Sequence, residues 1–209
     1  MGCGASKEEE QPLASVPAGF GVFDPKFQVP QGRSTCVEVS QSWWAWGPDF
    51  CVRDPKTMAK KFTCVLKDNE FGPKSEHVCC GADQEPVFIM RKCDSMANRE
   101  AKIFSAKDPT TELFKVLHRF GDGPVTEGLK DRTGKETNLA LEVNWNNRKA
   151  TLWMGETPWH ANVNDRRAIA RMQTEDSGEP LQVDVAGGVD TALVMAVLCG
   201  YQHCSNAED

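Results

Sequence analysis

The first six residues carry a pattern for lipid attachment. They read MGCGAS and match M-G-x-x-x-[ST], in which Met1 is removed and the amine of Gly2 is myristoylated. Glycine is required there because its amine must enter the transferase pocket without a side chain in the way. Cys3 comes next and is placed for palmitoylation once the first lipid has brought the chain to a membrane.

A second anchoring signal is needed because one myristoyl chain holds a protein only marginally at a membrane. The usual alternative, a polybasic segment, is missing, since Lys7 is followed by three glutamates at 8–10. We therefore predict a protein anchored by lipids on Gly2 and Cys3, at the cytoplasmic face of the plasma membrane or an endomembrane. Two alternatives stay open: myristoylation alone, and an unmodified tail.

The densest basic cluster lies between two predicted strands and comprises Arg53, Lys56, Lys60 and Lys61. If these residues share one rim of the fold, each would contribute on the order of 1 kcal/mol near an anionic lipid surface. Phosphoinositide headgroups are the ligands that we consider. The alternative is a solvated loop in which Asp54 offsets part of the charge.

The cysteines fit neither a zinc site nor a disulfide framework. There are nine, an odd number, without a C-x-x-C pair and without an apolar signal segment before them. We expect most to be reduced thiols, several of them packed in the core. A Cys-His nucleophilic pair stays open because the chain also has four histidines, although no strained elbow surrounds any cysteine.

Other chemistries find little support. Residues 128–136 (GLKDRTGKE) have one residue too many between the glycines for a phosphate-binding loop, and Glu136 replaces the required Ser or Thr. No metal-ligand spacing or EF-hand pattern is present, so we predict no metal and no cofactor. The net charge of −6 argues against a nucleic-acid surface. The tryptophans of residues 43–46 (WWAW) fit the core or a membrane interface.

The body of the chain is a series of short strand patterns separated by Gly, Pro, Asp and Asn. Residues 121–136 are expected to be a loop, and 166–173 would be helical by propensity alone although a strand is preferred there. About eleven or twelve strands are predicted. The runs are 35–46, 50–53, 61–66, 76–80, 86–91, 102–105, 111–120, 138–145, 149–154, 159–163, 168–172 and 181–185.

The last ordered segment determines the architecture. Residues 191–202 carry no formal charge and are apolar on all sides of a helix, so this helix must be buried. It is too short to cross a bilayer. A long sheet tends to curl, and closure removes its exposed edges. We therefore predict a mainly β fold, a closed antiparallel barrel of about 12 strands around a central C-terminal helix, with Asp190 as N-cap and Val189 before it.

The segment from 183 to 201, a strand followed by Gly187-Gly188-Val189-Asp190 and an apolar helix, resembles the C-terminal part of the LURP-one-related family. Weaker similarity covers residues 107–116. That family belongs with the tubby C-terminal domain and the phospholipid scramblases. The resemblance implies a twelve-strand barrel around a helix and, by analogy with tubby-like relatives, binding of phosphoinositide headgroups through surface Lys and Arg. Scrambling is less expected because no membrane-spanning segment follows the helix.

These observations combine into one interpretation. Residues 1–30 are expected to be a lipidated flexible tail, residues 31–204 the tubby-like barrel with its helix at about 190–203, and 205–209 a disordered end. The predicted function is a non-enzymatic, monomeric binding or signalling adaptor at a membrane, whose protein partner the sequence does not identify. The alternatives are a scramblase-like or lipid-transfer protein, and a thiol-dependent enzyme.

Overall fold

A computed structural model gives the architecture of the chain. It describes residues 12–14, 16–17, 20–40, 49–67, 76–95, 98–119, 123–144, 146–155, 166–175 and 179–205. Two predicted segments, the tryptophan-rich run at 43–46 and the strand at 159–163, lie outside these residues, as do Gly2 and Cys3.

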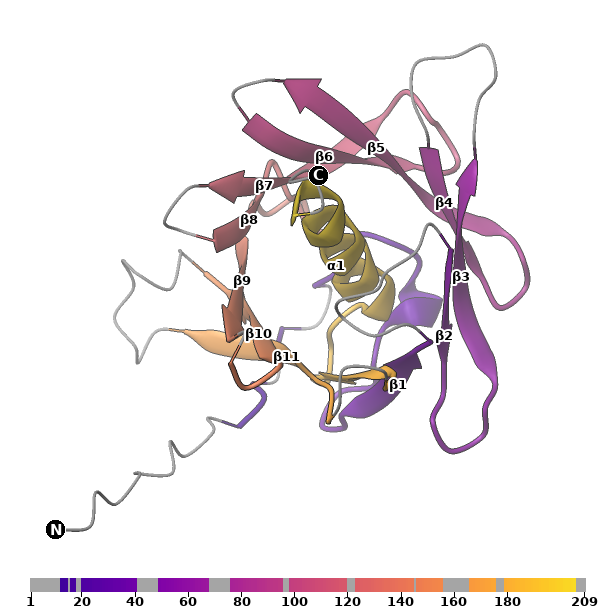
Figure 1. Ribbon diagram of the computed structural model, residues 1–209, viewed down its shortest axis with the longest axis vertical. Helices are drawn as coiled ribbons and strands as arrows, with labels where there is room; N and C mark the ends of the chain where they lie inside the picture. Colours follow the sequence, from indigo (N-terminus) through magenta and orange to yellow (C-terminus); the bar gives the residue numbers. More distant parts are fainter. Residues whose placement is uncertain are drawn as a thin grey trace, which may run out of the picture.

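The described strands form a closed antiparallel barrel, which confirms the predicted fold (Figure 1). Each strand pairs with its neighbours in sequence, and β12 closes the barrel on β1 with Thr35 opposite Val185. The strands are β1 (Thr35–Val39), β2 (Phe50–Arg53), β3 (Lys60–Lys67), β4 (Glu76–Gly81), β5 (Pro86–Ser95), β6 (Asn98–Ser105), β7 (Glu112–Arg119), β8 (Gly123–Glu127), β9 (Leu139–Asn144), β10 (Lys149–Met154), β11 (Arg167–Gln173) and β12 (Leu181–Val185).

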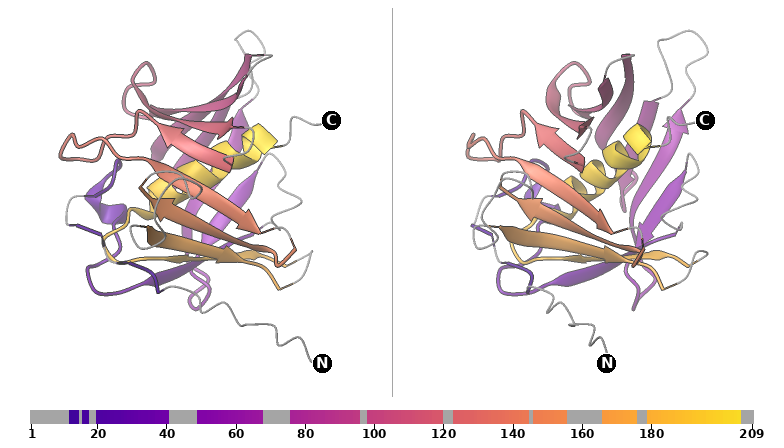
Figure 2. Two further views of the ribbon diagram at one scale, coloured as in Figure 1. Left: turned by 90° about the vertical axis from the view of Figure 1, so that its left-hand side faces the viewer. Right: turned by 60° about the vertical axis from the view of Figure 1, so that its left-hand side comes forward.

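Helix α1 (Thr191–Ser205) runs through the inside of the barrel (Figure 2). Every residue from Thr191 to Tyr201 is buried, because the helix is surrounded by strands. The strands supply the rest of the core through alternation: in β12, Leu181, Val183 and Val185 point inward and are at most 1% exposed. The prediction of a central helix is confirmed.

The structure corrects one prediction, the loop at 121–136, and supports another, the strand at 168–172. Strand β8 lies within the segment that we expected to be a loop at 121–136. Its five residues begin at a glycine, and Gly123 and Gly128 both have positive φ, so local propensity conceals it. Residues 167–173 form strand β11, as we preferred, although their composition favours a helix. Its pairing with β10 and β12 overrides propensity.

The expected flexible tail of residues 1–30 is wrong in its second half. Residues 20–30, which we call the plug, cover one end of the barrel and contain the 3₁₀ helix η1 (Pro25–Phe27). Val16, Phe20, Phe23 and Val29 are buried in the core. Their irregular spacing gives no helical or strand period, so composition alone suggested a spacer. The helix also ends later than expected, at Ser205.

Candidate functional site

One end of the barrel carries all the candidate site residues that the structure describes. We call it the plug end, because the plug lies there beside the start of α1, opposite the end of that helix (Figure 2). Strands alternate in direction around the barrel, so the connections that follow β2, β4, β6 and β8 emerge at this same end. Segments far apart in sequence are therefore neighbours at the plug end.

Asp190 joins the plug to the helix. Its Oδ1 accepts hydrogen bonds from the backbone amides of Ala192 at 2.9 Å and Leu193 at 3.3 Å, which confirms the predicted N-cap. Its Oδ2 accepts from the amides of Val22 at 3.2 Å and Phe23 at 2.9 Å in the plug. Burial raises the pKa of Asp190, and the hydrogen bond from Phe23 and the charge of Arg132 oppose that rise.

Arg132, on the connection between β8 and β9, completes this network. Its Nη2 lies 3.3 Å from Oδ2 of Asp190, and its Nε donates to the carbonyl of Phe23 at 2.6 Å. Nη1 donates to Oε1 of Gln28 at 3.1 Å. Gly21 is required beside the pair, because its φ is 147° and a Cβ there would lie 3.0 Å from both Arg132 and Asp190. The only fully buried carboxylate among the described residues is thus paired and hydrogen-bonded.

The β2–β3 hairpin is organised differently. Oδ1 of Asp54 accepts from the amides of Lys56 at 2.9 Å and Thr57 at 3.0 Å, and these bonds hold the pKa of Asp54 below its usual value. The amide of Met58 donates to the carbonyl of Asp54 at 2.8 Å. This turn leaves Met58 at φ 59° with 55% of its surface exposed.

The structure brings together three of the four predicted basic residues. Lys56, Lys60 and Lys61 are all exposed on the β2–β3 hairpin. Arg53 is half-buried at the base of the hairpin, opposite Glu38 of β1, and its Nε is buried without a hydrogen-bond acceptor in the described part of the chain. It therefore does not share the exposed surface of the three lysines.

Sequence reasoning missed the apolar component of this hairpin. Among the described residues, the exposed large hydrophobic side chains are Met58, in the turn of the hairpin, and Val65, near the far end of β3. An apolar residue flanked by lysines was visible in the sequence as Lys56-Thr57-Met58-Ala59-Lys60, but its exposure was not. The combination of cationic and apolar groups suits a negatively charged lipid surface.

Three further connections at the plug end contain an aspartate that accepts hydrogen bonds within its own turn, as Asp54 does. They are Asp83, Asp108 and Asp131. Each of these carboxyl groups has a pKa below its usual value; for Asp83 the main cause is the ion pair with Lys26, whose Nζ lies 2.8 Å from Oδ2. These aspartates shape the turns in which they lie.

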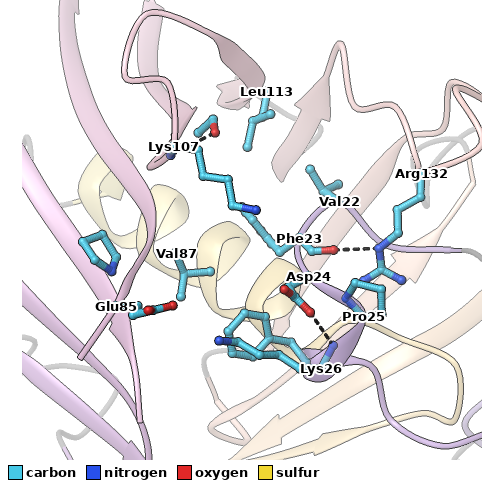
Figure 3. A pocket seen from close by; sticks show the side chains of 13 residues that line it. Val22, Phe23, Asp24, Pro25, Lys26, Glu85, Val87, Lys107, Leu113 and Arg132 are labelled. Atoms are coloured by element: carbon cyan, nitrogen blue, oxygen red, sulfur yellow. Dashed lines mark hydrogen bonds between the residues drawn. The ribbon is translucent and has the colours of Figure 1, made fainter. Parts of the chain in front are cut away.

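A pocket of about 430 Å³ opens at the plug end (Figure 3). It lies between the plug and the connections that follow β4 and β6. Its lining combines half-buried apolar residues, such as Val22, Val87 and Leu113, with charged residues that include Lys107 and Arg132.

Seven cysteines are free in the structure, and four of these are buried: Cys64, Cys79, Cys199 and Cys204. Burial and the nearby Asp184 carboxylate raise the pKa of Cys36 to about 11, and burial also raises the pKa of Cys80, so both remain thiols at neutral pH. Within the described ranges, no cluster of three or more His, Cys, Asp or Glu residues could hold a metal ion.

Comparisons with known proteins agree on the fold. Residues 35–201 match the LURP-one-related family. A protein from Arabidopsis thaliana, solved by X-ray crystallography, superposes with a TM-score of 0.59 at 18% identity, over 87% of this chain and 97% of that chain. No match is found among curated proteins. In the part of the chain that the structure describes, no helix has both the length and the hydropathy needed to span a membrane.

Proposed function

Since the chain belongs to the LURP-one-related family, we propose that it is a non-enzymatic binding or signalling adaptor whose plug end faces an anionic membrane. Lipids on Gly2 and Cys3 anchor it, and the β2–β3 hairpin contacts phospholipid headgroups. The observation that carries this proposal is the exposure of Met58 among Lys56, Lys60 and Lys61.

The path of the N-terminal segment is compatible with this orientation. The amide of Ala14 donates to the carbonyl of Ala168 at 2.8 Å, near the start of β11 and so at the plug end. Pro12 follows Gly2 by ten positions, and such a segment spans at most about 35 Å. Acyl chains on residues 2 and 3 would therefore keep the barrel close to the membrane, and the hairpin contact would determine which end faces it.

Met58 adopts the left-handed conformation, as Gln84 and Arg148 do in two other hairpin turns. In this conformation its apolar side chain is exposed to solvent. Three lysines at about 1 kcal/mol each bind anionic lipid only weakly. Weak headgroup contacts become sufficient when acyl chains hold the protein at the surface.

Vesicle sedimentation tests the headgroup contact. Protein made in bacteria, and therefore without acyl chains, should bind vesicles that contain phosphoinositides and not neutral ones. Lys60→Glu/Lys61→Glu should weaken this binding at least about tenfold, because two attractive charges become repulsive. The matched control is Lys67→Glu/Lys149→Glu, which makes the same charge change at the opposite end of the barrel and should bind like wild type. Equal binding by wild type and the hairpin variant would refute the proposal.

Lipid attachment is tested separately. Intact-mass analysis of protein from a eukaryotic host should show a myristoyl group, and Gly2→Ala should release the protein from membranes in cells. A Cys3→Ser variant should keep the myristoyl group and bind membranes less stably. An unmodified Gly2 would contradict the anchoring proposal and leave the hairpin experiment unaffected.

A further inference from the structure

The pocket at the plug end has the size of a small-molecule site. Its volume of about 430 Å³ lies within the usual range for ligand pockets, about 300 to 1,000 Å³. It is separate from the exposed face of the β2–β3 hairpin, because none of the residues that line it belongs to that hairpin.

The pocket has an apolar side. Val22 from the plug, Val87 from β5 and Leu113 from β7 line it, and all three are only partly buried although they pack against the core. Part of their apolar surface is therefore available to a ligand. Covering that surface with hydrocarbon removes it from water, which is favourable.

Most charged groups around the pocket are already engaged. Arg132 uses Nε, Nη1 and Nη2 in bonds to Phe23, Gln28 and Asp190. Asp24 caps η1 by accepting from the amide of Lys26, and the Lys26 ammonium pairs with Asp83 at 2.8 Å.

Lys107 and Glu85 are the exceptions. The backbone amide of Lys107 donates to Oγ of Ser105, but within the described part of the chain neither the Lys107 ammonium nor the Glu85 carboxylate has an ion pair or a hydrogen bond. Figure 3 shows the Lys107 side chain extending across the pocket toward Phe23. A cation that reaches into a partly apolar pocket provides a site for an anion that carries a hydrocarbon group. Glu85, also in the lining, adds its charge to those of Asp24 and Asp83 around Lys26.

We propose that this pocket binds an amphiphilic anion, with a phosphate or carboxylate group on Lys107 and hydrocarbon against Val22, Val87 and Leu113. The ligand is either a membrane lipid that enters at the plug end or a free amphiphile. This site does not depend on the membrane-binding role of the hairpin.

Binding of a short-chain, monomeric phosphatidic acid tests the pocket by calorimetry, with NMR shifts to locate the site. Wild-type protein should bind and show shifts at Val22, Val87 and Leu113. Lys107→Ala should weaken binding at least about tenfold. Lys130→Ala, at the same end but outside the pocket, is the matched control and should bind like wild type.

The experimental arms separate the two ligand sources and the two sites. If vesicles deliver the ligand, Lys107→Ala should also reduce extraction of labelled phosphatidic acid from vesicles; if only the soluble form binds, the free amphiphile is the ligand. Lys60→Glu/Lys61→Glu should leave binding of the monomeric form unchanged. Absence of monomer binding, or equal affinity of wild type and Lys107→Ala, would overturn the pocket proposal while leaving the hairpin proposal standing.

Discussion

Asp190 and the lysines of the β2–β3 hairpin lie at the same end of the barrel, but the first charge is buried and paired whereas the others are exposed. The Asp190 carboxylate is fully buried, paired with Arg132 and bonded to four backbone amides. Lys56, Lys60 and Lys61 are exposed on a turn that also exposes Met58. The first group joins the plug to the helix, whereas the charges of the second group are exposed to solvent.

Removing Asp190 should have the largest effect. Asp190→Ala leaves Nη2 of Arg132 and four amides without their acceptor, so we expect a loss of about 3–5 kcal/mol in the free energy of unfolding. Urea denaturation measures it. Asp131→Ala, at an exposed turn aspartate, is the control and should lose much less. Equal losses would mean that Asp190 has no special structural role.

A double-mutant cycle sharpens this difference. Asp190→Ala, Arg132→Ala and the double variant should give a coupling energy of about 1–3 kcal/mol, because the two side chains share one network with the plug. The same cycle on Lys60 and Lys61 should give a value near zero. A coupling near zero for Asp190 and Arg132 would place the stability of the plug in its apolar residues instead.

Met58→Gly should separate stability from binding in the hairpin. Glycine removes the left-handed strain, so the free energy of unfolding should rise by up to about 1 kcal/mol, while binding to anionic vesicles falls. Met58→Ala is the control: it removes the apolar side chain and keeps the strain. Undiminished vesicle binding by both variants would show that Met58 does not contact lipid.

The smallest expected effect is on pH dependence. The lowered pKa of Asp131 means that its stabilising contribution is present above the unfolded pKa of about 3.9 and is lost as pH falls through the folded value. The raised pKa of Asp190 acts with the opposite sign, since its contribution is present at low pH and is lost as pH rises through the folded value.

Asp131→Asn should therefore lose less stability than wild type between about pH 5 and pH 2. Thermal unfolding across this range measures the slope. Glu136→Gln is the control, because its carboxylate accepts no hydrogen bond from the described residues. If stability falls with pH as steeply in Asp131→Asn as in wild type, the hydrogen bonds to the Asp131 carboxylate do not stabilise the fold.

Sequence patterns predicted the parts of the molecule that local periodicity encodes. The apolar helix, its cap at Asp190 and most strands follow from residue spacing, since alternation and all-round apolarity have direct structural meaning. Strand β8 and the plug do not show such a period. Their burial depends on neighbours that are distant in sequence, such as Val189, whose carbonyl accepts from the amide of Val29.

The candidate site was predictable only in part. The lysines were evident as a cluster, but the exposure of Met58 and the burial of Arg53 depend on how the hairpin meets the barrel. The Arg132–Asp190 pair and the pocket bring together segments that no local pattern connects. The lipidation sites at Gly2 and Cys3 lie outside the described residues and stay predictions.

The position of α1 has a consequence for the timing of folding. The helix that fills the barrel is synthesised after the twelve described strands, and the closing strand β12 comes just before it. At about 5–20 residues per second, β1 waits on the order of 10 s on the ribosome for β12, its second pairing partner, and for the helix that fills its core. Closure of the barrel must therefore come late, and the edge of β1 that pairs with β12 is exposed until then.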